Sequence, residues 1–559
     1  METPGKALPA VDTAATAQWD ELVRSFVESY FEAHPTFAAG AGRHELDGRL
    51  PDWSPAAFED EVARLRQDRR RALAFDAAVL DEPRRFEREL LVAVTDADLF
   101  WLEEAEWHWR NPLFYSGPLD PNLYLAREYA PLEQRLRSYV GYARQVPRAA
   151  AQVRANLRTP LPRTYAELGE MSFGGLAGYY ESDVPAVFAA VDDADLQRQM
   201  REANAAAARA MRELGAWFHD QIPPAGGAGG EFRLGADLYG RMLSATERVD
   251  VPLAELEAAG RRELARNLAA LREACAACDP GLSVAECLAR VMARKPPEGP
   301  VEAARRQLAR LHRFIEENGL VSIPGSEEAR VEEAPPYQRW NSAYIDIPGP
   351  YDRHLPSIYY IAPPDPSWSP QEQAEYVPGE ADLLFVSAHE VWPGHFLQFL
   401  HSNRAASPLS QLFVGYGFAE GWAHYSEELM WEAGFGGGDP CLHIGQLQNA
   451  LLRNVRYLVA LGLHTGDLTV EEAERMFREQ AFQDPANARQ QAARGTFDPG
   501  FLNYTLGKLM IRKLREDWAG PRGGRSAWRE FHDRLLSYGG PPIPLVRRAM
   551  MGGEAGAVL

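Results

Sequence analysis

The sequence has few cysteines, no long apolar run and no excess of basic charge. Only four of its 559 residues are cysteines, too few for a disulfide framework. No run approaches the roughly 18 apolar residues of a membrane span, and residues 1–6 lead into no apolar segment of a signal peptide. The formal net charge of −20 argues against nucleic acid or an anionic membrane as a partner. We therefore expect a cytoplasmic protein that binds neither.

The cysteines are Cys275, Cys278, Cys287 and Cys441. The first two form a C-x-x-C pair, which suits a redox pair or half of a zinc site. This pair lies in an alanine-rich helical stretch, and the sequence has no second C-x-x-C. Ordinary helix cysteines are therefore the favoured interpretation.

Apolar residues recur at three- and four-residue spacing along much of the chain, which is typical of amphipathic helices. The clearest stretches are 16–33, 55–79, 82–108, 129–156, 193–219 and 251–277. Two short runs of β-forming residues, 343–347 and 357–361, flank turn residues and predict a small hairpin. The sequence thus predicts a mainly α fold with a small β-sheet. We expect residues 1–330 to form a mostly helical part and 331–559 a part that carries the motifs below, within one integrated fold.

Two clusters near the middle of the second part have the residue types of a hydrolytic zinc site. The first is HEVWPGH (389–395), and the second, EGWAH (420–424), begins 25 residues after His395. Such a site needs three protein ligands, an open position for water and a base that deprotonates the water. His389, His395 and Glu420 provide the ligand types, and Glu390 is a carboxylate directly beside the first ligand.

The spacing of the two histidines differs from the usual H-E-x-x-H helix, in which the ligands lie one turn apart. His395 follows His389 by six residues, so on a regular helix the two side chains would face different sides. Pro393 lacks an N–H group and opens the helix, and Gly394 tolerates unusual dihedral angles. A two-residue π-type bulge would return His395 to the face of His389. Alternatively, Pro-Gly ends one helix and His395 begins the next.

The motifs resemble those of a known bacterial family. AHEVWPGHFLQ (388–398) resembles the H-E-x-x-P-G-H-H-x-Q signature of the domain-of-unknown-function 885 family. That family is similar to the gluzincin zinc metallopeptidases thimet oligopeptidase, angiotensin-converting enzyme and carboxypeptidase Taq. EGWAHYSE (420–427) matches a second family motif, and a third is matched in part by Arg494, Pro499, Gly500, Tyr504 and Gly507. The resemblance implies a large helical fold with a deep cleft and a small β-sheet next to the metal-binding helix, on residues 380–392.

The sequence also departs from the family pattern. Phe396 replaces the second histidine of the first motif, and Phe501 replaces a glutamine in the third. His424 stands at a position where the family tends to have leucine, and Ala460 where an aspartate often occurs. The zinc ligands are retained, so these departures concern the substrate pocket.

The chemistry assigns a role to each residue of the predicted centre. His389, His395 and Glu420 would hold one Zn²⁺. Glu390 would act as general base and pass the proton to the leaving amine. By resemblance to the peptidases, Tyr504 would donate a hydrogen bond to the developing oxyanion; the alternative is a core tyrosine.

Further residues are candidates for supporting roles. His424 and Glu427 share a helical face with Glu420 and would orient a ligand. His424 is also the alternative ligand if His395 does not bind, or a packed helix histidine. Three cations near Tyr504 are candidates to hold a substrate carboxylate or are structural: Arg456, Arg494 and Lys508. His464 lies in a G-L-H element that resembles a family motif and lines the cleft if the resemblance holds.

These features predict a zinc-dependent hydrolase of peptide or peptide-like amide bonds, of carboxypeptidase or dipeptidase type. Its partner would be a small peptide, paired with a strand of the 343–361 hairpin by β-augmentation unless that hairpin only supports the helix. One alternative is a metal enzyme that acts on a non-peptide amide or a specialised metabolite. Another is a non-catalytic helical binding protein with a structural or vestigial metal site, against which the retention of Glu390 argues. The sequence does not indicate an oligomeric state.

Overall fold

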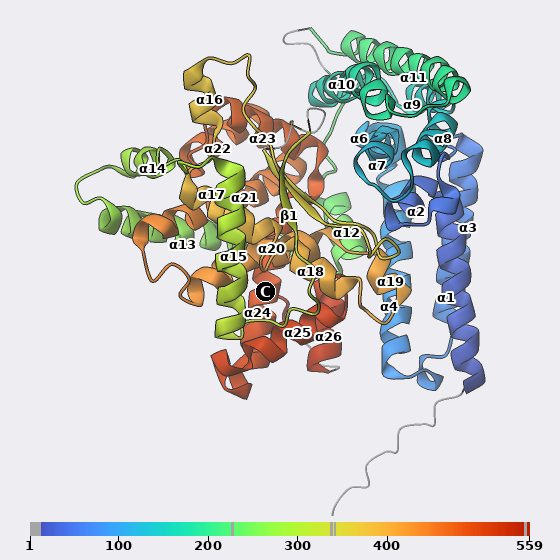
Figure 1. The fold of residues 1–559 in the computed structure, drawn as a ribbon. Coiled ribbons are helices and arrows are strands. Elements are labelled where there is room, and N and C mark those ends of the chain that lie inside the picture. The colour runs from blue at the N-terminus through green and yellow to red at the C-terminus, as the bar shows by residue number, and fades with distance from the viewer. Residues whose placement is uncertain (1–12, 225–228, 336–338, 340–341, 553–555) are drawn as a thin grey trace, which may run out of the picture.

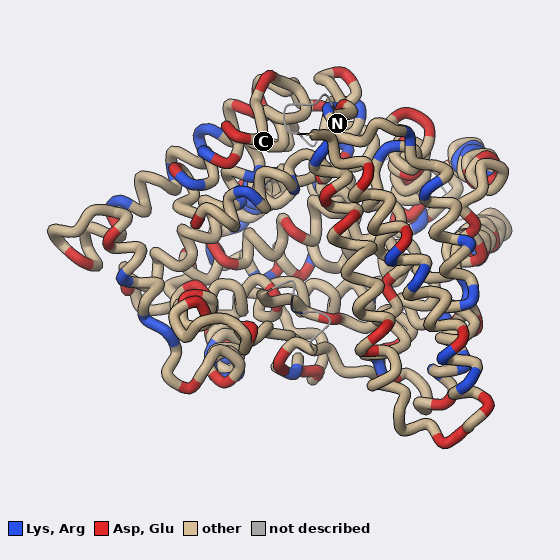
Figure 2. Tube along the Cα trace, turned by 90° about the horizontal axis from the view of Figure 1, so that it is seen from above, with Lys and Arg blue, Asp and Glu red and all other residues tan. Residues whose placement is uncertain are grey.

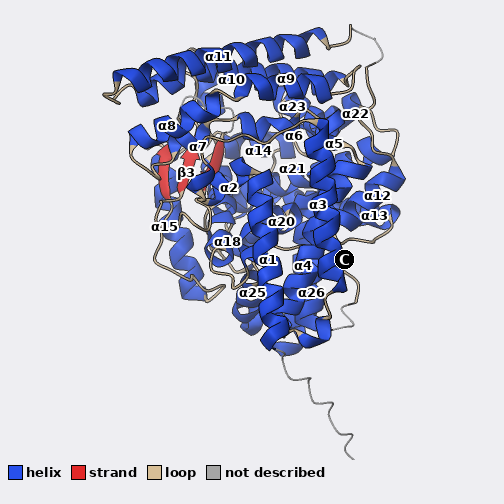
Figure 3. Ribbon diagram, turned by 90° about the vertical axis from the view of Figure 1, so that its right-hand side faces the viewer, coloured by secondary structure: helices blue, strands red, loops and turns tan. Residues whose placement is uncertain are grey.

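The computed structural model describes residues 13–224, 229–335, 339, 342–552 and 556–559. The chain is mainly α-helical with one small sheet, as the sequence predicts (Figures 1 and 3). The helices before the sheet are α1 (Thr13–Ala33), α2 (Pro35–Ala41), α3 (Pro55–Ala74), α4 (Glu82–Leu99), α5 (Trp107–Arg110), α6 (Leu113–Ser116), α7 (Asn122–Ala126), α8 (Leu132–Ala143), α9 (Val146–Asn156), α10 (Arg163–Phe188), α11 (Ala194–Asp220), α12 (Ala236–Glu247), α13 (Leu253–Cys278), α14 (Val284–Met292) and α15 (Pro300–Asn318). The helices after it are α16 (Pro370–Tyr376), α17 (Glu380–Glu390), α18 (His395–Ser402), α19 (Pro408–Leu412), α20 (Tyr416–Glu432), α21 (Pro440–Thr465), α22 (Val470–Gln480), α23 (Pro485–Phe497), α24 (Asn503–Ala519), α25 (Trp528–Ser537) and α26 (Ile543–Met551).

Two of the predicted helices are interrupted. The stretch 129–156 divides into α8 and α9, because Pro147 fits only in the first turn of a helix. The stretch 82–108 divides after α4 into a π-helical turn, Phe100–Glu104, and the short α5. The other four predicted helices correspond to α1, α3, α11 and α13.

Helix α10 is long and was not predicted, because its glycines and Pro185 obscure the helical pattern. It pairs with α11 along one end of the molecule (Figure 3). A Cβ atom at Gly169 would lie 2.3 Å from the ring of Phe218 on α11. The glycines that weaken the helix signal therefore permit the close contact between these two helices.

The sheet has the strand order β1-β3-β2 and lies beside α17. Strand β3 (Ile358–Ile361) pairs antiparallel with β2 (Ala343–Asp346), which confirms the predicted hairpin. On its other side β3 pairs in parallel with β1 (Arg330–Glu333), which was not predicted. The hydroxyl of buried Tyr359 lies 3.4 Å from Ser387 Oγ on α17, so the central strand supports that helix directly.

The main hydrophobic core joins both predicted parts of the chain. Leu256 and Leu308 from the first part pack in one cluster with Phe385 and Leu451 from the second. Within this core α20 crosses α24 at glycines: a Cβ atom at Gly507 would lie 1.9 Å from the carbonyl oxygen of Gly417. This close crossing brings together the helices that carry Glu420 and Tyr504.

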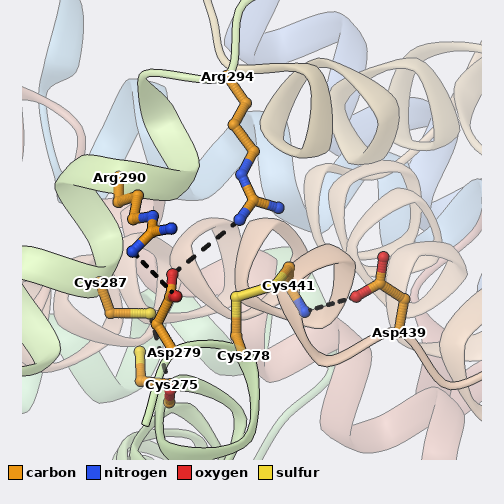
Figure 4. The surroundings of a disulfide bond; sticks show 8 residues. All are labelled: Cys275, Cys278, Asp279, Cys287, Arg290, Arg294, Asp439 and Cys441. Atoms are coloured by element: carbon orange, nitrogen blue, oxygen red, sulfur yellow. Dashed lines mark hydrogen bonds and ion pairs between the residues drawn. A yellow bond between two sulfur atoms is a disulfide. The ribbon is translucent and has the colours of Figure 1, made fainter. Parts of the chain in front are cut away.

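Cys278 and Cys441 form a disulfide that joins the end of α13 to the start of α21 (Figure 4). The interpretation of Cys275 and Cys278 as ordinary helix cysteines is therefore wrong for Cys278. Helices α13 and α21 pack side by side and place the two Cα atoms 5.0 Å apart, within the range that a disulfide requires. Sequence alone does not reveal this contact between distant helices.

Acidic and basic residues are interspersed over the helices, as Figure 2 shows along the Cα trace. Many of them form ion pairs on the surface, such as Arg137 with Glu133 and Arg261 with Glu257. None of the helices in the described parts of the chain is both long and apolar enough to cross a membrane.

Candidate metal centre

The predicted metal motif lies where α17 ends and α18 begins. Helix α17 ends at Glu390, a cis peptide bond joins Trp392 to Pro393, and α18 begins at His395. The prediction of one helix with a π-type bulge is therefore wrong, and the alternative that Pro-Gly separates two helices is correct.

The break is held by specific contacts. The Gly394 N–H donates to the carbonyl oxygen of Ala388 at 2.9 Å, and a Cβ atom at Gly394 would lie 1.7 Å from the carbonyl oxygen of His389. The indole N–H of Trp422 on α20 donates to the Pro393 carbonyl oxygen at 2.8 Å. These contacts return His395 to the side of His389, with the two rings perpendicular and their centroids 4.8 Å apart.

Glu420 on α20 completes a group of three convergent potential metal ligands. Its Oε2 lies 3.3 Å from His389 Nε2 and 3.5 Å from His395 Nε2, and one ligand atom from each residue lies within 4.8 Å of the others. Glu420 Oε2 is buried and has no well-directed hydrogen-bond donor in the described chain. Burial raises the pKa of Glu420, but the neighbouring His389 and His395 hold it well below its ordinary value, so the carboxylate is ionised and can bind a cation. One divalent cation would satisfy all three ligands, so this donor set fits zinc.

Glu427 lies behind His389 and fixes its orientation. Glu427 Oε1 is 2.7 Å from His389 Nδ1, and Arg453 Nη2 on α21 is 3.0 Å from the same oxygen. With Nδ1 bound to a carboxylate, Nε2 is directed at Glu420. Burial and Arg453 lower the pKa of His389, but Glu420 and Glu427 raise it more, to about 9. The structure thus places Glu427 against His389, one of the predicted ligands.

His424 lies outside the ligand group. It is fully buried, and its Nδ1 is 3.7 Å from Glu427 Oε2. Burial, and next the charge of Lys508, lower the pKa of His424 to about 3. The alternative in which His424 replaces His395 as ligand is therefore wrong: His395 is the histidine that converges with His389 and Glu420.

Glu390 occupies the last position of α17, directly after His389. It is half-buried and is not part of the ligand group. Burial raises the pKa of its carboxyl group, while the nearby charges of His389 and His395 lower it. A carboxylate beside a metal ligand, with its pKa raised, has the properties of a general base.

Tyr504 lies at the start of α24, which packs against α20, the helix that carries Glu420. It is 7% exposed, and burial together with the charge of Glu420 raises the pKa of its phenol, so the hydroxyl remains a hydrogen-bond donor. The guanidinium of Arg456 on α21 lies over the Tyr504 ring, 5.0 Å from its centroid, and over the Phe501 ring at 4.8 Å. Arg456 Nε donates to Gln491 Oε1 at 2.9 Å.

The other predicted cations are already paired with carboxylates. Arg494 binds Asp498 at 3.1 Å. Lys508 Nζ is fully buried, 2.5 Å from Glu263 Oε1 and 2.8 Å from Glu428 Oε2. The substrate-binding role predicted for Lys508 is wrong, because both of its contacts lie inside the fold.

His464 has structural contacts only. Its Nε2 lies 2.9 Å from the carbonyl oxygen of Gly495, and its ring stacks on that of Tyr239. Burial lowers the pKa of His464 to about 4, so it is neutral. These contacts tie α21 to α23 and α12 and do not support a position in a cleft.

Two residues near the centre were missed from the sequence. Arg453 contacts both His389 and Glu427, and Tyr416 receives a hydrogen bond from Arg494 at 3.3 Å and donates one to Asp498 at 3.1 Å. Arg453 could have been predicted from the sequence, because it is a charged residue in an apolar stretch of α21 and such residues are rarely buried without a partner. Tyr416 could not have been predicted, because its partners, Arg494 and Asp498, are distant in sequence.

Solved structures share this fold. A protein described as a lipoprotein of unknown function from Shewanella oneidensis superimposes with a TM-score of 0.79 at 21% identity, covering 95% of this chain and 99% of that one. One from Colwellia psychrerythraea, also described as a lipoprotein, gives a TM-score of 0.80 at 19% identity, covering 96% and 99%. An M32 carboxypeptidase from Deinococcus radiodurans R1 gives a much lower TM-score of 0.37 at 15% identity, covering 98% and 96%.

No curated protein sequence matches the chain. Its sequence does match the family described as "Bacterial protein of unknown function (DUF885)" over residues 35–550. The match includes the motifs at 389–395 and 420–427 and spans nearly the whole chain. The protein therefore belongs to the DUF885 family.

Proposed function

We propose that this protein is a zinc-dependent hydrolase of peptide or peptide-like amide bonds. The observation that carries the proposal is the convergence of His389, His395 and Glu420 on one point, with Glu427 behind His389 and Glu390 beside it. A purely structural zinc site is closed by four protein ligands. Three ligands and an adjacent carboxylate are typical of a hydrolytic centre.

The ligand residues would bind the ion through two imidazole nitrogens and one carboxylate oxygen, a set that suits zinc. Zinc in such a site lowers the pKa of a bound water and polarises a substrate carbonyl. Glu427 and Arg453 hold the His389 ring so that Nε2 faces the ligand group. They act by orienting the ligand rather than by touching substrate.

Glu390 would take the proton from the attacking water and deliver it to the nitrogen of the leaving amine. Its raised pKa suits both steps, because a carboxyl group of very low pKa is a poor base. The Tyr504 hydroxyl would donate a hydrogen bond to the carbonyl oxygen as that oxygen gains negative charge. Its proximity to Glu420 supports this position.

Arg456 is the best candidate to hold a substrate carboxylate. Of the cations around Tyr504, Arg453 pairs with Glu427, Arg494 with Asp498, and Lys508 with two glutamates, but Arg456 has no carboxylate within 4.0 Å in the described chain. Arg456 is partly buried, and desolvation lowers its pKa to about 10, which reflects the cost of a cation without a carboxylate partner. A free C-terminal carboxylate would offset this cost through a bidentate pair. We therefore propose a carboxypeptidase or dipeptidase activity on short peptides.

The cytoplasmic location stays a prediction. The Cys278–Cys441 disulfide is more typical of an oxidising compartment.

The direct test is incubation of zinc-loaded protein with a mixed library of short peptides, read by mass spectrometry. Glu390→Gln is the matched control, because it keeps the side-chain shape and removes the base. We expect cleavage by the native protein and at least about 10²-fold less by the variant, at equal zinc content. Equal turnover by both proteins would exclude Glu390 as the base.

Substrate anchoring needs a separate comparison. Free peptide acids should be cleaved faster than the same peptides with an amidated C-terminus, and Arg456→Gln should remove most of that difference by raising KM for the free acids. Equal rates on acids and amides would exclude carboxylate anchoring.

A further inference from the structure

All four cysteines of the chain gather at one place, where three helices meet (Figure 4). Cys275 and Cys278 come from α13, and Cys441 from the start of α21. Cys287 comes from α14 and lies beside Cys275, with its sulfur 3.9 Å from the Cys275 carbonyl oxygen. The only C-x-x-C pair of the sequence thus meets both remaining cysteines in the fold, which sequence spacing does not predict.

Three potential ligands at this place are already within reach of one ion. The sulfurs of Cys278 and Cys287 and a carboxylate oxygen of Asp279 lie within 4.8 Å of one another. Cys441 is bonded to Cys278 and therefore adds a fourth donor beside them. In tetrahedral zinc sites with Zn–S bonds of about 2.3 Å, neighbouring sulfurs are roughly 4 Å apart. Only small side-chain movements would be needed once the disulfide is reduced.

The charges of the proposed ligands would be balanced by one divalent cation together with two neighbouring arginines. Asp279 pairs with Arg290 at 3.1 Å and with Arg294 at 4.0 Å, as the dashed lines in Figure 4 show. Three thiolates and one carboxylate carry four negative charges, and two guanidinium groups and one divalent ion carry four positive charges. Asp279 Oδ2 is buried and makes the 4.0 Å ion pair with Arg294 but no hydrogen bond in the described chain, so it can still accept a metal ion.

We propose that reduction of the Cys278–Cys441 disulfide converts this cluster into a second metal site, in which Cys278, Cys287, Cys441 and Asp279 bind a thiophilic divalent ion such as zinc. A dithiol reductant supplies two electrons and two protons, the S–S bond breaks into two thiols, and the reductant leaves as its own disulfide. On metal binding the three thiols release their protons to solvent. The oxidised protein carries a covalent link between α13 and α21, and the reduced protein carries a metal link in its place.

Cys275 provides the matched control. It is buried in the core on α13, one turn before Cys278. It lies next to Cys287 but outside the group of convergent ligands. Serine at this position should leave the second site intact.

The test is titration of the full-length protein with Co²⁺ before and after reduction by a phosphine, followed in the near ultraviolet. Thiolate-to-cobalt charge transfer is specific for sulfur ligands, so the His389 centre does not contribute to the signal. We expect no band in the oxidised protein, a saturable band in the reduced protein that corresponds to one equivalent more than the oxidised protein binds, and loss of the band when the disulfide is re-formed. Absence of a band in the reduced protein would overturn the proposal.

The variants identify the ligands. Cys287→Ser should abolish or strongly weaken the band in the reduced protein, and Cys275→Ser should retain it. The opposite pattern would refute this ligand set. Because the band and its reversal by oxidation are measured on the native sequence, the proposal remains testable if Cys287→Ser does not fold.

Discussion

Glu247 is predicted to make the stability of the fold depend on pH. This residue ends α12 and is 2% exposed; its Oε1 accepts hydrogen bonds from the Gly417 N–H at 3.2 Å and from Asn503 Nδ2 at 2.8 Å. It thereby joins the starts of α20 and α24, the helices of Glu420 and Tyr504. Burial raises the pKa of Glu247 from 4.5 to about 7, because its two hydrogen bonds offset only part of the desolvation cost.

The direction in which stability changes with pH follows from the linkage between proton binding and folding. A raised pKa in the folded state means that the fold favours the protonated carboxyl group, so its contribution to stability is fully present below about pH 4.5 and is lost as the pH rises through about 7. At about 1.36 kcal/mol per pH unit, the displacement from 4.5 to 7 corresponds to about 3 kcal/mol. Glu247→Gln keeps the shape and removes the ionisation. Its stability relative to the native protein should therefore increase by up to about 3 kcal/mol between pH 4.5 and pH 8.

Urea unfolding of both proteins across this pH range measures the difference. Glu255→Gln, at an exposed position of α13, controls for the loss of one carboxylate from the acidic chain. A pH-independent difference between native protein and Glu247→Gln would refute the reasoning, because it would show that Glu247 is ionised in the fold at no cost.

Two further predictions concern the centre and its support. Glu427→Gln weakens the hold on His389 Nδ1, so zinc affinity should fall by about 10–100-fold in a chelator competition; unchanged affinity would mean that Glu427 does not orient the ligand. Gly507→Ala places a Cβ atom 1.9 Å from the Gly417 carbonyl oxygen and should lower the free energy of unfolding by about 1–3 kcal/mol, whereas Gly520→Ala, with nothing within 4 Å, should cost little. Equal melting temperatures for these two variants would contradict the tight crossing of α20 and α24.

The sequence predicted which residues form the candidate centre, but it predicted less well how the fold brings them together. Residue types and spacing singled out His389, His395 and Glu420, which converge in the structure, because a metal restricts its ligands to few side chains. They did not reveal how the chain crosses the Pro393–Gly394 break, because the contacts that hold it include the indole of Trp422 on another helix. The helical pattern likewise predicted most helices but not α10, whose glycines serve its contact with α11.

Roles that depend on long-range partners were the least predictable. Lys508 lies one turn from Tyr504 and resembled a substrate cation, but Glu263, 245 residues away in sequence, neutralises it. The place of Arg453 in an apolar stretch of α21 indicates a buried partner, but that partner, Glu427, lies on another helix and could not be named from the sequence. Arg456 differs from the other cations near Tyr504 because they are paired with carboxylates in the fold, and proximity in sequence does not show this difference.

The most direct test of the central claim is a crystal structure of the zinc-loaded protein with anomalous data collected at the zinc edge. We predict an anomalous peak between His389 Nε2, His395 Nε2 and Glu420, at about 2.0–2.2 Å from each ligand atom. The His389 Nδ1–Glu427 contact should be retained and His424 should remain unbound. No peak at this point, or a peak bound by His424 with His395 turned away, would contradict the assignment of the metal centre.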